Sequence, residues 1–289
     1  MTQARTTAQL ISLTALLLSP PGLVSEPISI KFSTISKAAI EARLHSVEDT
    51  NSRRQQSLKT LFENSGCIGG NLTEQKVKYA KVPNTICTLA GETGSVIVVG
   101  GHFDFVDAGK GVVDNWSGCS LLPSLYQSLS PIPRRHTFIF AGFTDEERGL
   151  VGSRFYVNQV SKEQMKKISA MVNIDSVGTS STKIELDRGD KTLANALALV
   201  AGTFKLPLDV VNVHNVGRSD SDSFQDHHVP ALAIHSLTQE TFPILHTRRD
   251  QMNAIRLDDY YDTYLLVRAY LAYLDQVLDP NSAPQENKK

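Results

Sequence analysis

Short apolar runs alternate along the chain with longer segments in which hydrophobic residues recur at helical spacing. Continuous apolar runs of strand length are typical of a sheet that helices cover on both faces. The runs of this kind are Ser95–Gly100, His136–Gly142, Ala170–Ile174 and Pro230–Ile234. The helical segments are Gly118–Leu129, Leu150–Asn158, Lys191–Phe204 and Leu257–Leu278. The alternation predicts a single α/β domain with a mixed, mostly parallel central sheet and helices on both of its faces.

The part of the chain ahead of these units carries a different pattern. Helical spacing extends over residues 35–65 and ends at Gly66. Two more strands are expected at Gln75–Tyr79 and Asn84–Leu89. The segment after Pro280 is polar, so we expect residues 281–289 to form a loose, flexible tail.

The first residues do not fit this fold. Arg5 precedes the apolar run Leu10–Leu18, and Pro20 then interrupts the apolar pattern. A cationic start, a short apolar stretch and a break are typical of a secretory signal peptide. The apolar run is much shorter than the ~20 residues that span a bilayer. We therefore expect a signal peptide over residues 1–25, a domain over residues 26–280, and a secreted or periplasmic protein without a membrane partner.

Composition and charge fit a globular protein. The 289 residues are 41% hydrophobic and 20% charged, and 29 Lys and Arg against 30 Asp and Glu leave a formal charge of −1. This balance gives no electrostatic basis for binding nucleic acid. Three cysteines suit an exported protein. Cys67 and Cys87 would close a loop of about 20 residues, whereas Cys119 falls in an apolar helical pattern that predicts a buried thiol.

Polar residues of the types that bind metals follow the predicted strands directly. In open α/β sheets, sites form outside the carboxyl ends of the strands. The candidates are His102, Asp104, Asp114, Glu146, Glu147, Asp175 and His246. Each has an ordinary alternative, such as a helix cap for Asp114 or a turn for Asp175. Their common position favours a site, because two histidines and three carboxylates can hold two divalent cations if one carboxylate bridges.

Six motifs occur in a fixed order along the chain. They are Gly-Gly-His-Phe-Asp, Asp-Asn-Trp-Ser-Gly, Glu-Glu-Arg-Gly-Leu-Val-Gly-Ser, Asn-Ile-Asp-Ser-Val-Gly, Arg-Ser-Asp and His-Thr-Arg-Arg-Asp. With them the sequence resembles metallopeptidase family twenty-eight, which includes secreted zinc aminopeptidases, glutaminyl cyclases and glutamate carboxypeptidases. The resemblance spans residues 50–275. It implies the three-layer zinc-exopeptidase fold and a secreted zinc aminopeptidase that acts on peptides with a free N-terminus.

The resemblance also implies a cofactor of two zinc ions. By motif position, His102 and Asp175 are the ligands of one zinc, and Glu147 and His246 are the ligands of the other. Asp114 would bridge both ions. Carboxylates mixed with imidazoles suit zinc, and manganese or cobalt can substitute.

Two further residues receive catalytic roles. Asp104 lies two positions beyond His102, on the same side of a strand, where it is expected to accept the imidazole N–H and fix the ring. Glu146 is the predicted general base, which removes a proton from the water held between the two metals as that water attacks the scissile carbonyl.

The sequence departs from the family pattern at two places. Ser221 stands where the family often has the histidine of Ser-Asp-His. Arg248 and Arg249 follow the last predicted ligand, where they either select acidic substrate groups or face solvent; solvent is the favoured interpretation. The adjacent pair His227 and His228 is left out of the site, because neighbouring positions seldom share a metal.

Two other functions compete with the aminopeptidase. A glutaminyl cyclase uses a similar scaffold, but cyclases typically have Asp-Ser where this chain has Asp114-Asn115, and a Trp where Leu245 precedes the last histidine. A non-catalytic binding domain should have lost ligands or the base, which are all present. The substrate side-chain pocket is expected between residues 211–218 and 238–245, with Phe242, Pro243 and Ile244 as an apolar wall.

Overall fold

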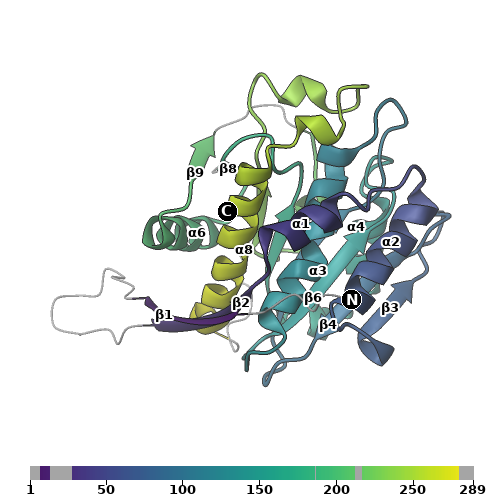
Figure 1. Ribbon diagram of the computed structural model, residues 1–289. Helices are drawn as coiled ribbons and strands as arrows, with labels where there is room; N and C mark the ends of the chain where they lie inside the picture. The colour runs from purple at the N-terminus through teal and green to yellow at the C-terminus, as the bar shows by residue number, and fades with distance from the viewer. Residues whose placement is uncertain (1–6, 14–27, 186, 212–216, 280–289) are drawn as a thin grey trace.

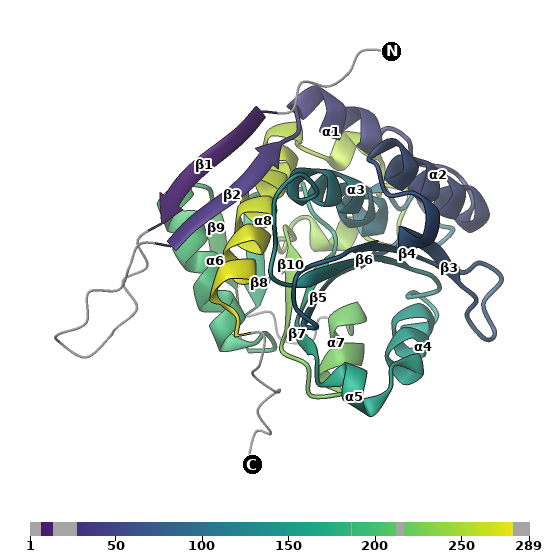
Figure 2. The ribbon, with the colours of Figure 1, turned by 90° about the horizontal axis from the view of Figure 1, so that it is seen from below.

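The computed structural model describes residues 7–13, 28–185, 187–211 and 217–279. An eight-stranded mixed sheet runs through its centre (Figures 1 and 2). Its strands, in spatial order, are β3 (Leu72–Gln75), β4 (Asn84–Leu89), β6 (Thr137–Phe143), β5 (Val96–His102), β7 (Ile168–Ile174), β10 (Ala231–His235), β8 (Thr182–Glu185) and β9 (Leu208–Val211). The pairs β6–β5, β5–β7, β7–β10 and β8–β9 are parallel, and the other three are antiparallel. The predicted mixed, mostly parallel sheet is confirmed.

Helices cover both faces of this sheet, which gives three layers (Figure 2). One face carries α1 (Lys37–Leu44), α2 (Asn51–Asn64), α3 (Ser117–Leu129) and α8 (Leu257–Val277). The other face carries α4 (Val151–Gln159), α5 (Lys162–Met165) and α7 (Asp220–Gln225). Helix α6 (Lys191–Phe204) packs against α8. Four short helical segments are η1 (Gly69–Asn71), η2 (Val112–Trp116), η3 (Phe242–Ile244) and η4 (Met252–Ala254).

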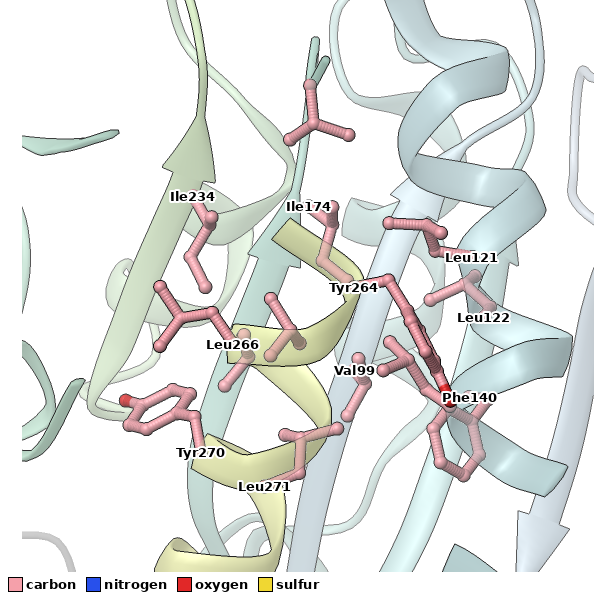
Figure 3. Close-up of a cluster of buried hydrophobic side chains, with 14 of the residues drawn as sticks. Val99, Leu121, Leu122, Phe140, Ile174, Ile234, Tyr264, Leu266, Tyr270 and Leu271 are labelled. Carbon is pink, nitrogen blue, oxygen red and sulfur yellow. The ribbon is translucent and has the colours of Figure 1, made fainter. Parts of the chain in front are cut away.

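Each face of the sheet has its own hydrophobic core. Successive side chains of a strand point to opposite faces, so Val99 of β5 packs under α3 and α8, whereas Val98 packs in the cluster on the opposite face. Figure 3 shows the larger core, where Tyr264 of α8 lies near Val99 and Phe140. These two cores hold the middle of the sheet rigid, and the strand ends that carry the polar motifs project from it.

The predicted helices agree with the structure where one apolar stripe faces the sheet. The segment Lys191–Phe204 is helical over its full length, and Asp190 caps it by accepting bonds from the first-turn backbone. The helical spacing expected over residues 35–65 corresponds to two helices, α1 and α2. Thr50 caps the N-terminus of α2, where its side chain accepts the Arg53 N–H. This cap marks the start of a second helix, separate from α1.

One strand was predicted in the wrong place. The strand expected at Gln75–Tyr79 lies at Leu72–Gln75, and the chain then turns, with Tyr79 at a positive φ of 71°. Its register pairs Leu72 with Cys87, which places the β3–β4 ladder beside the disulfide between Cys67 and Cys87. That disulfide matches the expected loop, and Cys119 is a buried free thiol as predicted.

The N-terminal region contributes a separate two-stranded sheet. Strand β1 (Thr7–Leu13) pairs antiparallel with β2 (Ile28–Thr34), which packs against α8 and α3. The rest of the predicted signal peptide, residues 1–6 and 14–25, and the tail, residues 281–289, lie outside the described residues, so both stay predictions. No helix in the described part of the chain is long and apolar enough to cross a bilayer.

Candidate metal centre

Loops from four neighbouring strands meet at one edge of the sheet. Strands β6, β5, β7 and β10 run parallel, so their carboxyl ends lie together. His102 is the last residue of β5, Asp175 directly follows β7, and Glu147 follows β6 by four positions. Asp114 lies in η2 and His246 follows η3. The fold therefore gathers five residues that are up to 144 positions apart, since 246 − 102 = 144.

The five side chains form two clusters that share one carboxylate. His102 Nε2 lies 3.2 Å from Asp114 Oδ1 and 3.8 Å from Asp175 Oδ2. His246 Nε2 lies 3.1 Å from the other oxygen, Asp114 Oδ2, and 3.0 Å from Glu147 Oε2. In each cluster the three donor atoms lie within 4.8 Å of one another. Asp114 thus offers one oxygen to each cluster, which is the geometry of a bridging ligand.

The donor set fits two divalent cations. Each cluster combines an imidazole nitrogen with carboxylate oxygens, the mixture that zinc accepts in catalytic sites. The second oxygen of Glu147, Oε1, is buried without a hydrogen-bond partner among the described residues. A buried polar atom of this kind calls for a partner such as an ion.

The surrounding carboxylates raise the pKa values of both imidazoles. A hydrogen bond to Asp114, together with the charge of Glu147, raises the pKa of His246 to about 9. Burial opposes the protonation of His102, but the surrounding carboxylates, Glu146 foremost, still raise its pKa well above its ordinary value. The site therefore attracts positive charge strongly.

Asp104 holds the loop that carries the two glutamates. Its carboxylate accepts the backbone N–H of Glu146 at 3.0 Å and that of Glu147 at 3.2 Å. His102 Nδ1 lies 3.2 Å from the backbone carbonyl of Asp104 and 3.5 Å from its Oδ1. Asp104 was expected to accept the imidazole N–H and so to fix the ring. The structure gives the closer contact with the ring to the carbonyl and gives the carboxylate a second task on the glutamate loop.

Two residues that the sequence reasoning did not single out hold the bridging loop. Asp250 accepts the backbone N–H of Val113 at 2.7 Å and that of Asp114 at 3.1 Å. Asn115 donates to the Ile174 carbonyl at 2.9 Å and accepts the Ser176 N–H at 3.1 Å, so it ties the bridging loop to the end of β7. Asn115 belongs to the motif Asp-Asn-Trp-Ser-Gly, and Asp250 belongs to His-Thr-Arg-Arg-Asp. Their positions in these motifs were the sequence feature that could have identified them.

Glu146 lies beside the two clusters without belonging to either. Glu146 lines the same cavity as the residues of the two clusters. Burial raises its pKa to about 9, opposed by His102 and reinforced by neighbouring acids such as Asp220. With this pKa the carboxyl group is protonated near pH 7, but the charge of a cation held in the adjacent clusters would lower the pKa and give the carboxylate form that can accept a proton.

The remaining sequence candidates fall away from the cavity. Arg248 and Arg249 are exposed and do not line it, and Arg249 donates to the Pro243 carbonyl. The interpretation that these cations face solvent is therefore confirmed. His227 and His228 are exposed as well and lie outside the cavity.

Asp220 was noted only for the serine that follows it, yet it is fully buried. Burial raises the pKa of its carboxyl group to about 7, against the opposing charge of His102. Its neighbour Ser221 lines the cavity at the position where the family often has a histidine.

A cavity of about 1270 Å³ opens directly onto the clusters. Phe242 and Pro243 line it as predicted, while Leu245, rather than Ile244, completes that wall among the described residues. Residues 212–216 of the predicted pocket loop lie outside the described part of the chain.

Comparison with known proteins identifies the family. The model of Peptidase family M28 matches residues 84–271, which include all seven predicted site residues. The chain belongs to peptidase family M28. A curated relative, leucine aminopeptidase 2 of Trichophyton rubrum, is 31% identical over 154 residues, which are 50% of this chain and 31% of the relative. The chain thus spans about a third of that relative's length.

Solved structures show the same fold at low sequence identity. The LapA aminopeptidase of Legionella pneumophila superimposes with a TM-score of 0.75 at 24% identity, over 84% of this chain and 73% of LapA. The zinc aminopeptidase BSAP of Bacillus subtilis gives 0.61 at 22% identity, over 70% of this chain and 54% of BSAP. A glutaminyl cyclase of an Acidobacteriales bacterium gives 0.67 at 16% identity, over 83% of this chain and 93% of the cyclase. The M28 fold therefore accommodates both types of enzyme.

Proposed function

We propose that this M28 protein is a secreted, zinc-dependent aminopeptidase that binds two zinc ions. The observation that carries the proposal is the bridging geometry, in which each oxygen of Asp114 faces a different histidine. Two cations held in this way beside Glu146 form the arrangement of a co-catalytic hydrolase. The aminopeptidase names of the sequence relative and of two structural neighbours support the same reaction.

The ligand roles follow from the two clusters. His102 and Asp175 would hold one zinc, Glu147 and His246 would hold the other, and Asp114 would hold both. When bound, the zinc ions supply Lewis-acid polarisation of the scissile carbonyl and of the attacking water.

Glu146 is the group that moves the proton. Its carboxylate takes a proton from the attacking water and delivers that proton to the leaving amine, so the base becomes the acid in the second half of the reaction. Asp104 positions Glu146 through the backbone bond at 3.0 Å. Because Asp104 is only 2% exposed, water does not compete for this hydrogen bond.

The carboxylates in the cavity support a preference for the N-terminal residue of a peptide. Glu146 and Asp175 both line the cavity, and Asp175 retains some exposure. A protonated α-amine is attracted by carboxylates at this position. A peptide with a blocked N-terminus lacks that charge, so the proposed substrates are peptides with a free N-terminus.

Export to the periplasm or the medium is part of the proposal. A disulfide between Cys67 and Cys87 persists in an oxidising compartment. The cationic and apolar pattern of residues 1–25 has the form of a signal peptide, whose cleavage would remove strand β1 from the exported protein.

Release of free amino acids from unblocked dipeptides and aminoacyl amides tests this function. Release should stop with a chelator, return with zinc and be absent from acetylated substrates. Glu146→Gln should keep its zinc and lose about a hundredfold or more in kcat, whereas Asp114→Ala should lose zinc as well. Glu163→Gln, an exposed change on α5, is the matched control. An active Glu146→Gln enzyme would rule out Glu146 as the base.

Glutaminyl cyclase is the second candidate, because the superposition with the glutaminyl cyclase of the Acidobacteriales bacterium includes 93% of the cyclase chain. That activity predicts ammonia release from N-terminal Gln substrates and no release of free amino acids from the peptide panel.

A further inference from the structure

The cavity extends past the metal ligands to a floor formed by two neighbouring strands. His235 at the end of β10 and Lys183 on β8 are direct cross-strand partners, and both line the cavity. On its other side β10 pairs with β7, and the backbone N–H of Asp175 donates to the Ile234 carbonyl at 2.9 Å (strand order in Figure 2). His235 is therefore one strand spacing from Asp175, and both residues line the same cavity.

The hydrogen bonding of His235 defines its tautomer. The backbone N–H of Leu237 donates to His235 Nδ1 at 3.1 Å, so Nδ1 is an acceptor and carries no proton. Burial lowers the pKa of the ring to about 4, and the charge of Lys183 lowers it further, against an opposing effect of Asp175. The ring is thus neutral near pH 7, and its single proton is on Nε2.

That Nε2–H has no partner within the described residues, although only 9% of His235 is exposed. A buried donor without an acceptor is unfavourable, and in a binding cavity a ligand can supply the acceptor. The neighbouring Lys183 is already paired, because its Nζ donates to Asp209 at 2.8 Å and to the Oγ and the backbone carbonyl of Ser181 at 2.9 and 3.4 Å. Of these two residues His235 alone offers an unpaired donor, while Leu237 and Phe242 supply apolar walls of the cavity.

We propose that His235 selects a first residue whose side chain carries an acceptor oxygen, either an amide or a carboxylate. The inference rests on the proposed aminopeptidase function and specifies its substrate class. The His235 Nε2–H donates to the side-chain oxygen of the substrate. Leucine, which gives the relative from T. rubrum its name, has the shape of asparagine but leaves this donor unpaired.

Substrates of matched shape test the proposal. The zinc-loaded enzyme is assayed with leucyl, asparaginyl and aspartyl p-nitroanilides, and with the longer set of methionyl, glutaminyl and glutamyl substrates. The ratio of kcat/KM for the polar to the apolar substrate of each set is compared between wild type and His235→Phe. In His235→Phe we expect the polar-to-apolar ratio to fall about tenfold for the amide substrates, the carboxylate substrates or both. A fall of this size corresponds to the loss of one hydrogen bond.

Controls separate this contact from a structural effect. His227→Phe makes the same change at an exposed position outside the cavity and should leave the ratio unchanged. His235→Gln keeps an N–H donor on a shorter side chain and should retain most of the preference for polar side chains. This variant also tests the proposal if His235→Phe fails to fold.

Calorimetric binding of free asparagine, aspartate and leucine to the zinc-loaded protein gives a readout that does not need turnover. If His235→Phe selectively loses binding of asparagine or aspartate, the proposal is supported even when no substrate is hydrolysed. The absence of hydrolysis by itself would refute only the aminopeptidase function. The role of His235 would be overturned if the polar-to-apolar ratios of kcat/KM in both substrate sets changed by less than about threefold in His235→Phe, with unchanged relative binding of the free amino acids.

Discussion

Replacing Asp104 with asparagine tests how far the metal centre depends on the loop behind it. The carboxylate accepts two backbone N–H groups, those of Glu146 at 3.0 Å and Glu147 at 3.2 Å. In Asp104→Asn one accepting oxygen becomes an amide N–H₂, so one of these backbone donors faces another donor. The substitution changes almost no volume, and its effect should therefore come from the hydrogen bonds and the charge.

The magnitude follows from the type of bond. A hydrogen bond to a charged, buried acceptor is worth about 1.5–3 kcal/mol. If that energy serves to hold Glu146 in place, its loss lowers kcat by about 10- to 150-fold, because each 1.36 kcal/mol corresponds to about a factor of ten. Glu147 shares the same support, so zinc affinity should fall by about tenfold. The free energy of unfolding should fall by about 1.5–3 kcal/mol.

Three measurements check this reasoning: steady-state kinetics at saturating zinc, zinc content after dialysis, and urea denaturation. Asp107→Asn is the matched control, since Asp107 is exposed on the same loop after β5. An Asp104→Asn enzyme with wild-type kcat and wild-type zinc affinity would show that the backbone carbonyl alone is sufficient, and that the carboxylate does not position the glutamates.

Three further predictions concern metal binding, the bridging loop and the disulfide. His246 must lose its proton before it binds zinc, and since its pKa is about 9 without metal, the zinc affinity of the cluster that contains His246 should rise at least about tenfold per pH unit from pH 7 towards 9; a flat profile in a competition titration with a chromophoric chelator would contradict this. Asp250→Asn should weaken zinc binding by about tenfold, measured by the same titration, because Asp250 accepts the backbone N–H of Asp114. Cys67→Ser opens a loop of 20 residues and should lower the free energy of unfolding by about 3 kcal/mol; an unchanged denaturation midpoint under oxidising conditions would mean that the bridge adds no stability.

Much of the architecture was readable from local patterns. The helix Lys191–Phe204 and the strand Asn84–Leu89 have the predicted bounds, because their apolar spacing and end signals lie within a few residues of one another. The seven site candidates were readable for a related reason. Strand ends follow from the apolar runs, and parallel strands bring those ends to one edge of the sheet.

What depends on contacts between distant segments was decided only by the tertiary structure. Asp250 supports Asp114 across 136 positions, and no local pattern encodes which backbone N–H groups its carboxylate accepts. The shift of the strand from Gln75–Tyr79 to Leu72–Gln75 likewise reflects pairing with a strand further along the chain.

His235 shows the same division most clearly. In the sequence it is one more residue at the end of an apolar run. Its tautomer depends on the turn back to Leu237, and its burial and its access to the cavity depend on the strands on either side. Periodicity determines which face of an element is buried, whereas the direction and partners of a single polar atom arise only when separate elements pack together.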